Sequence, residues 1–490
     1  MGRKSFQHGD AADRDDDSLQ VDETGTHYPP LWKTLVIISG LFMGVFLVAL
    51  DQTIIGTAIP KITDEFKTIQ DVGWYGSAYF LTSTALQPSY GRIYKSFDVG
   101  GLSYAKWGFL AAIFLFELGS LICAAAPTSA VLVGGRLPIG AISAVVVLLV
   151  LNPPPRPKSE IDKPVLVRIR ELDLVGALLL TAAVTCLLLV LQWGGNEYPW
   201  NDGRIIGLLV GFGLLTLVFI GTQIWLGEKA TLPPRIISQR TVAACCAFVV
   251  LFGGSAYLLM YYLPIFFQSI RGSSAIQSGI ELLPMLLGLV VSSFAVGALV
   301  TLLGYYTPFL VGSTAIFAAG AGLITTYSAD ISNPKWIGYQ VLAGAGLGAG
   351  FQVPQAAVQT VLAQEDIPVG SSALIFFQNL GGSIFISVGQ SVFQNSLSTA
   401  LKQLAPTVNP AVVFSAGATG LEKALKAVGQ GSAYQAVLDA YNRGLQDTFR
   451  VSLGLGLGAF LATLFVEWKN VKHGSGGDKK NNDSHPMLAV

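Results

Sequence analysis

The sequence predicts an all-α membrane protein that crosses the bilayer about twelve times. Hydrophobic residues make up 52% of the 490 residues and charged residues only 12%, far from the composition of a soluble globular chain. The apolar residues are collected in runs of about 20, and a helix of that length crosses a hydrocarbon core of roughly 30 Å. Such runs exclude a β-barrel, whose membrane strands alternate in polarity and are half as long.

The apolar runs set the boundaries of the predicted spans. These lie at residues 33–58, 73–93, 106–126, 128–151, 173–193, 203–226, 241–267, 278–303, 306–327, 336–361, 367–396 and 448–467. The polar stretches divide the chain into a disordered cytoplasmic tail at 1–32, an N-terminal bundle at 33–151, a cytoplasmic linker at 152–172, two linker helices at 173–226, a C-terminal bundle at 241–467 and a second disordered cytoplasmic tail at 468–490. Within the last bundle, residues 397–447 form an extracellular loop that is either an ordered cap or only partly ordered.

Basic residues fall mainly in alternate connections between the spans. With the N-terminus in the cytoplasm, the inside connections hold groups such as Arg168 and Arg170, whereas the outside ones hold isolated residues such as Lys61. The positive-inside rule therefore places both termini in the cytoplasm. The hydrophilic start of the chain lacks the apolar core of a signal peptide, so we expect the first span to act as its own insertion signal.

The composition argues against several other classes of protein. Basic and acidic residues both number 30, so net charge gives no indication of a nucleic-acid partner. All four histidines lie in the polar tails and all four cysteines in apolar runs, which predicts no metal site and disfavours a membrane-embedded enzyme. The glycine-rich run at 344–350 lies within an apolar span, where close helix packing is favoured over a nucleotide site. We therefore predict no catalytic residues and no cofactor.

Three ionisable side chains within the predicted spans are candidate functional residues, because a charge there costs several kcal/mol unless it faces a wet cavity or a partner. Asp51 lies in the outer part of the first span, Glu117 near the middle of the third, and Arg136 in the fourth. Asp51 and Arg136 lie at similar depths, so we expect that they can pair. Opening and closing a cavity around such a carboxylate would load and unload a proton. The alternative is a static charge network that only orients the helices.

Amide side chains recur in the spans of the second half. Gln352, Gln355 and Gln359 follow i, i+3, i+7 spacing, so they share one helical face that would avoid lipid. With nearby tyrosines they predict a cavity for a mostly apolar ligand with a few polar groups, although hydrogen bonding between helices is an alternative. The predicted lining residues are Tyr257, Tyr261, Gln352, Gln355, Gln359, Gln378 and Asn379.

Several motifs extend these expectations. The run LDQTIIGTAIP at 50–60 closely resembles the first-span motif of the major facilitator superfamily, in its drug:proton antiporter branch with fourteen spans. WYGSAY at 74–79 and FELGS at 116–120 are similar to the fungal members that export mycotoxins and drugs, and GYYTP at 304–308 extends the resemblance into the second half. The resemblance covers nearly the whole chain.

This resemblance implies two bundles of six helices that rock about a central site, two extra helices between them, and proton influx that drives export. Asp51 and Arg136 would belong to the proton-coupling region, with Glu117 as a further candidate. Gly91, Arg92 and Lys95 occupy the place of a cytoplasmic latch loop, but the acidic residue usual there is absent. The implied partners are a small hydrophobic substrate, protons and the lipid bilayer, with a monomer in the plasma membrane, or alternatively in a vacuolar or vesicle membrane.

The chain departs from the family pattern after Arg136. There the family has a long stretch between the arginine of the fourth span and an Asn-Leu-Pro-Ile-Gly run that opens the sixth, whereas Gly135-Arg136 continues directly into Leu137-Pro138-Ile139-Gly140 in this chain. The fifth span, which carries the antiporter glycine-proline motif, is missing, so the N-terminal bundle is incomplete. A nutrient importer on the same fold, or a non-transporting remnant or faulty gene model, therefore stays open beside a proton-coupled exporter.

Overall fold

The computed structural model describes residues 20–21, 27–28, 31–66, 74–76, 78–80, 82–84, 87–89, 102–150, 173–195, 198–416 and 420–471. It falls into two compact units, residues 1–49 and 50–490. In the first unit, β1 (Gln20–Val21) pairs antiparallel with β2 (His27–Tyr28) inside the tail that the sequence predicts to be disordered. The predicted latch residues 91–95 and linker 152–172 lie outside the described residues.

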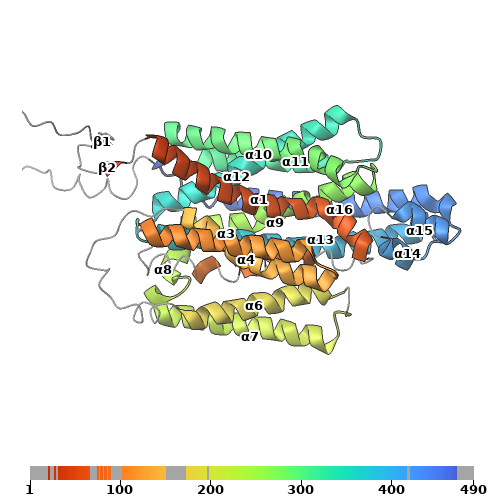
Figure 1. The fold of residues 1–490 in the computed structure, drawn as a ribbon, viewed down its shortest axis with the longest axis horizontal. Helices are drawn as coiled ribbons and strands as arrows, with labels where there is room; N and C mark the ends of the chain where they lie inside the picture. The colour runs from red at the N-terminus through yellow and green to blue at the C-terminus, as the bar shows by residue number, and fades with distance from the viewer. Residues whose placement is uncertain are drawn as a thin grey trace, which may run out of the picture. The chain divides into compact units, whose positions relative to one another are not determined.

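Helices form nearly all the regular structure of the described chain (Figure 1). They are α1 (Leu31–Phe66), α3 (Leu102–Ala124), α4 (Ser129–Val150), α6 (Leu174–Trp193), α7 (Gly203–Leu226), η2 (Gly227–Lys229), α8 (Pro234–Ile237), α9 (Arg240–Ser269), α10 (Ala275–Leu303), α11 (Thr307–Ile324), α12 (Asn333–Val361), α13 (Ile367–Leu404), α14 (Pro410–Ser415), α15 (Leu421–Ala427), η3 (Gly431–Ala433) and α16 (Tyr434–Thr463). Seven of those described are long and apolar enough to cross a membrane: α6, α7, α9, α10, α11, α12 and α13. The full number of spans stays a prediction, because most of residues 67–101 is not described.

The C-terminal bundle is built around α9. Its most apolar stretch is 78% buried, against 6% for α10 on the outside of the bundle. Helices α10 and α11 both pack on α12, and the glycine-rich run makes this approach possible. A Cβ on Gly344 would collide with the Met285 carbonyl of α10, and one on Gly346 would collide with the backbone of Phe317 on α11. The run thus serves close helix packing, as the sequence predicts.

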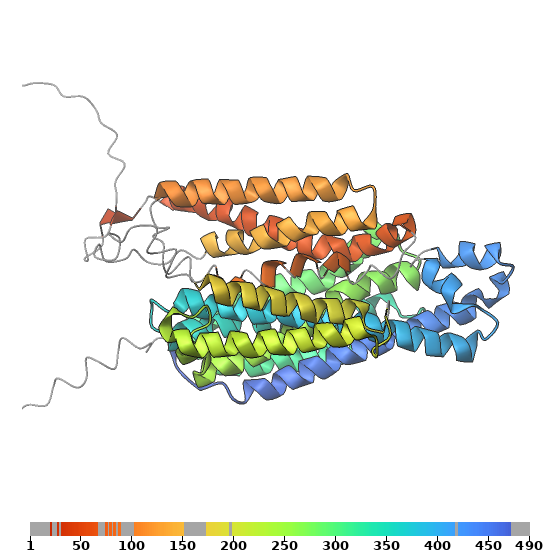
Figure 2. The same cartoon turned by 90° about the horizontal axis from the view of Figure 1, so that it is seen from below.

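The linker helices α6 and α7 form an antiparallel hairpin that packs on α13 (Figure 2). An apolar cluster joins them at Leu180, Val184, Leu188, Phe219, Leu232, Ala373 and Phe376. At the end of α6, Gln192 Nε2 donates to Ser387 Oγ of α13 at 2.9 Å. Just after the end of α7, Glu228 pairs with Arg235 of α8 at 2.8 Å, and Arg235 also pairs with the buried Asp366 at 2.7 Å. These hydrogen bonds raise the pKa of the Arg235 guanidinium. These contacts fix the hairpin to the C-terminal bundle.

Asp173 holds the two linker helices together where α6 begins. Its buried carboxylate accepts from Gly176 N at 2.6 Å, Gln223 Nε2 at 2.7 Å, and Thr231 N and Oγ1 at 3.1 and 3.0 Å. Removing this carboxylate would leave buried donors on α7 and on the following loop without their partner. The side chain therefore acts both as an N-cap and as a connection between helices.

We expect Asp173→Ala to lower the stability of the purified protein by about 2–4 kcal/mol, because the buried donors lose their charged acceptor. The measurement is thermal unfolding in detergent. Asp202→Ala is the matched control. The carboxylate of Asp202 also caps a helix, but among the described residues it accepts only from Arg204 N, at 2.8 Å. Its cost should be about 1 kcal/mol. Equal losses in the two variants would show that the Asp173 network does not join the helices.

Residues 397–447 contain more helix than the span boundaries predict. Helix α13 continues to Leu404 and α16 begins at Tyr434, with α14 and α15 between them at one end of the bundle (Figure 1). The extensions persist because they are amphipathic: Val437, Tyr441 and Leu445 are buried on one side of α16. The described part of this segment therefore contains helices between the two spans, and its role as an extracellular cap stays a prediction.

Candidate functional site

An ion pair between α1 and α4 forms the centre of the candidate site. Arg136 Nη2 lies 3.6 Å from Asp51 Oδ2, and the two side chains are only 5% and 15% exposed. The guanidinium also lies over the ring of Tyr79, 5.6 Å from its centroid, at a distance typical of a cation–π contact. The structure thus brings together two of the predicted site residues and adds Tyr79.

The pair is incompletely satisfied by hydrogen bonds. Asp51 Oδ2 and Arg136 Nε are buried, and neither has a hydrogen-bond partner among the described residues. A distance of 3.6 Å is beyond a good charge-assisted hydrogen bond, so attraction between the two groups is mainly electrostatic. A carboxylate in this state has an unsatisfied oxygen that can accept a proton.

Tyrosines of α9 reach this region from the C-terminal bundle. Tyr261 is buried, interacts electrostatically with both Asp51 and Arg136, and places its hydroxyl so close to Gly76 that a Cβ there would collide with it. The rings of Tyr257 and Phe80 meet edge to face with centroids 4.7 Å apart. The predicted tyrosines therefore contact the segment that follows α1, close to the ion pair.

The predicted amide face is present on α12. Gln352 and Gln359 are exposed, and Gln355 between them is half-buried and donates to Ser371 Oγ of α13. On α13, Asn379 is buried and Gln378 is half-buried. Part of this set thus connects helices, and part remains open on the surface of a membrane span.

Glu117 lies apart from the ion pair. It is exposed on α3, on a face with the exposed apolar residues Phe114, Leu118 and Leu121. No ion pair joins it to another described residue. The structure therefore does not gather Glu117 into the site with Asp51 and Arg136.

Sequence reasoning overlooked Glu281, one of several buried carboxyl groups of the described chain. It is 8% exposed on α10, and its Oε2 has no hydrogen-bond partner in the described part of the chain. Its backbone carbonyl accepts from Gln340 Nε2 of α12 at 2.9 Å. The sequence could have indicated Glu281, because it is an ionisable residue within the predicted span 278–303, the same criterion that selected Asp51.

Long apolar helices in packed bundles, with a buried ion pair beside an amide- and tyrosine-rich region, define a polytopic membrane transporter. Comparison of the fold agrees: a bacterial homologue of the human lysosomal transporter Spinster, in an inward-facing and unoccupied conformation, matches with a TM-score of 0.54. That match covers 90% of this chain and 98% of the other at 13% identity, so it shows the major facilitator fold alone.

Sequence comparison then identifies the family. Residues 137–456 match the model of the fungal trichothecene efflux pump family (TRI12). The chain is 40% identical to the MFS-type transporter astH of Aspergillus oryzae, covering 92% of this chain and 89% of that one. It is 42% identical to the MFS acetylaranotin efflux transporter ataA of Aspergillus terreus, covering 88% and 98%. The chain belongs to this family of fungal major facilitator efflux pumps, and is a transporter rather than an enzyme.

Proposed function

We propose that this chain exports small, largely apolar fungal metabolites in exchange for protons. The Asp51–Arg136 pair carries the proposal, because a buried acid with an unsatisfied oxygen beside a permanent cation can exist in two protonation states of different geometry. When Asp51 binds a proton, the attraction to Arg136 is lost. If the two bundle arrangements differ in this contact, protonation shifts the balance between them.

The predicted substrate cavity supports the same function. An amide face that is exposed on a membrane helix is costly in lipid and favourable along a wet path, and α12 presents such a face with Gln352 and Gln359. Tyr257 and Tyr261 supply apolar rings with polar ends next to the ion pair. We propose that these groups line the transport path and that the protein works as a monomer in the plasma membrane.

Proton coupling is tested in lipid vesicles with the purified chain and with a version that carries the fifth span of a relative such as astH after Arg136, in which transport should be faster. An imposed pH gradient should drive transport of a lipophilic dye such as the rhodamine 6G cation in the direction opposite to proton flow, and nigericin, which collapses the gradient, should stop it. Dye movement that is unchanged by nigericin would contradict proton exchange. Protein-free vesicles provide the background rate.

The proposed orientation predicts which tags can be reached from outside the cell. Tags at either terminus or at 152–172 should bind antibody only after permeabilisation, because the positive-inside rule places them in the cytoplasm. A tag near position 420, between α14 and α15, should bind antibody on intact cells. Labelling at 420 that requires permeabilisation would invert the scheme.

The comparisons also support the proposed loss after Arg136. The family match begins at residue 137, directly after that arginine. The alignment with astH extends over 517 residues yet covers 92% of a 490-residue chain, so astH contains stretches with no counterpart in this chain. We propose that most of this difference is the missing fifth span.

A further inference from the structure

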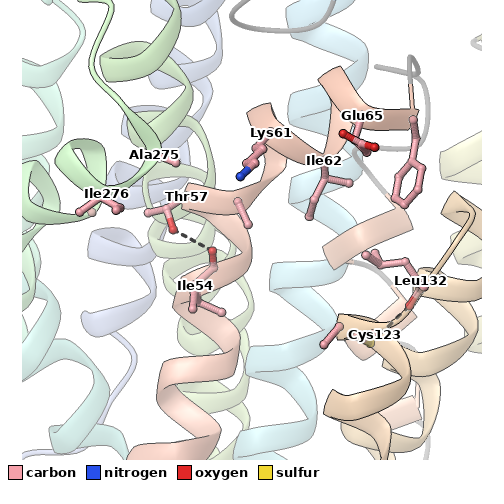
Figure 3. A pocket seen from close by; sticks show the side chains of 14 residues that line it. Ile54, Thr57, Lys61, Ile62, Glu65, Cys123, Leu132, Ala275 and Ile276 are labelled. Carbon is pink, nitrogen blue, oxygen red and sulfur yellow. Dashed lines mark hydrogen bonds between the residues drawn. The ribbon is translucent and has the colours of Figure 1, made fainter.

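A cavity of about 580 Å³ lies beside the second half of α1 (Figure 3). Its walls come from the end of α1, the end of α3, the start of α4 and the start of α10. In the proposed topology all four of these ends face the outside of the cell. The volume is within the range that encloses a drug-sized molecule.

The lining of this cavity is mainly apolar. Ile54, Ile62 and Phe66 of α1 lie opposite Leu132 of α4 and Ile276 of α10, with the small thiol of Cys123 on α3. Two exposed charged side chains, Lys61 and Glu65, line it as well. Figure 3 shows Lys61 near Ala275 on one side and Cys123 near Leu132 on the other. The cavity therefore suits an apolar body with a polar group at one edge.

A second cavity shows where the polar group would lie. It measures about 400 Å³, shares Lys61 and Ala275 with the first, and is lined by polar groups of the α9–α10 turn and the cap, including Gln268, Ser274 and Tyr434. Glu422 of the cap also lines it, and its carboxylate pairs with Lys426 at 2.6 Å. Lys61 thus stands between an apolar cavity and a polar one. Its ammonium group is placed to contact an anionic group of a molecule whose body fills the apolar side.

The apolar cavity also reaches the ion pair. Ile54 lies one helical turn from Asp51, and Leu132 one turn from Arg136. Cys123, which lines the cavity, interacts electrostatically with both charged groups. A molecule held in the cavity is therefore close to the groups whose contact depends on protonation.

We infer that this cavity is an outward-side binding site for a largely apolar molecule with a carboxylate or similar anionic group, which binds at Lys61. The inference rests on the proposed function for its direction, since an exporter needs a site from which its substrate leaves. Binding itself requires neither a membrane nor a pH gradient. The site can therefore be tested separately from transport.

The test is protection of Cys123 from N-ethylmaleimide in the purified full chain. Two probes share one apolar body: 1-pyrenebutyrate, which is anionic, and 1-pyrenebutanol, which is neutral. Mass spectrometry of the digested protein measures alkylation at Cys123 and at Cys186, which is similarly half-buried but lies on α6 outside the cavity. Both probes should slow alkylation of Cys123, the anionic one at lower concentration, and leave Cys186 unchanged.

Lys61→Gln tests the anionic contact. It should raise the pyrenebutyrate concentration that half-protects Cys123 by about tenfold, equivalent to about 1.4 kcal/mol, and leave protection by pyrenebutanol unchanged. Lys402→Gln, at an exposed lysine on α13, is the matched control and should change neither.

Three results would overturn the site: no protection of Cys123, equal slowing at Cys186, or equal behaviour of Lys61→Gln and Lys402→Gln toward pyrenebutyrate. Intact protection in a protein that shows no proton-driven transport, even with the fifth span of a relative inserted after Arg136, would instead contradict the proposed function and leave the site standing.

Discussion

Asp51→Asn is expected to reduce pH-driven dye export to the rate of protein-free vesicles. Asparagine keeps the size of the side chain but cannot bind and release a proton, so the contact with Arg136 no longer depends on pH. The amount of protein at the membrane should change little, because asparagine keeps the shape of the side chain and its amide oxygen can still accept a hydrogen bond from Arg136. The measurement is initial export rate per molecule at several imposed gradients.

Asp202→Asn is a suitable control for this experiment, since it changes an aspartate at the start of α7, away from the ion pair. It should retain pH-driven export. Undiminished export by Asp51→Asn would rule out Asp51 as the coupling carboxylate. Glu281, buried with an unsatisfied oxygen, and Glu117 would then be the next variants to test.

The second large effect concerns the junction between Arg136 and Leu137. We expect the 490-residue chain to give weak or no drug resistance, whereas insertion of the corresponding segment of a relative such as astH should give robust export. In the structure the junction lies within one helix, since α4 runs without a break from Ser129 to Val150 through Pro138. Both joined pieces cross from outside to inside in the family scheme, so the later helices keep their direction.

In the proposed deletion, the junction removes one helix of the N-terminal bundle. The exposed apolar face of α3 beside Glu117 is a surface that such a helix could cover. Resistance of cells to a panel of apolar drugs, with tagged protein quantified at the membrane, measures the effect. Strong proton-dependent export by the unaltered chain would contradict the expectation. Asp51→Asn should also be made in the restored chain, where the larger signal makes its loss clear.

Much of the helical framework could be predicted from the sequence, because apolar runs of this length have one stable form in lipid. The sequence also predicted that Asp51 and Arg136 can pair, because the rise per residue of a helix fixes how deep each residue lies in the membrane. It could not place Tyr79 beneath the guanidinium or bring Tyr261 to the pair, because those contacts depend on how separate helices pack. The same limit applies to Glu117, whose depth is suitable but whose helix face turns away from the pair.

Span boundaries were less accurate beyond the bilayer. Hydropathy marks where a helix leaves lipid and says little about where it ends, so α13 and α16 continue past the predicted limits on amphipathic sequence. The omission of Glu281 had a different cause. It lies only a few residues inside a predicted span, where a charged group is easily assigned to the water interface, and its burial follows from packing of α10 on α12.

The α6–α7 hairpin, which is attached to α13, gives the two halves of the protein different contact with lipid. The most apolar stretch of α7 is only 11% buried, so this helix presents most of its circumference to acyl chains. Among the described residues, apolar packing, Gln192 and Arg235 fix the hairpin to the C-terminal half, so it widens the lipid-facing perimeter of that half. We therefore expect a change in bilayer thickness to alter the hydrophobic mismatch of the C-terminal half more than that of the N-terminal half.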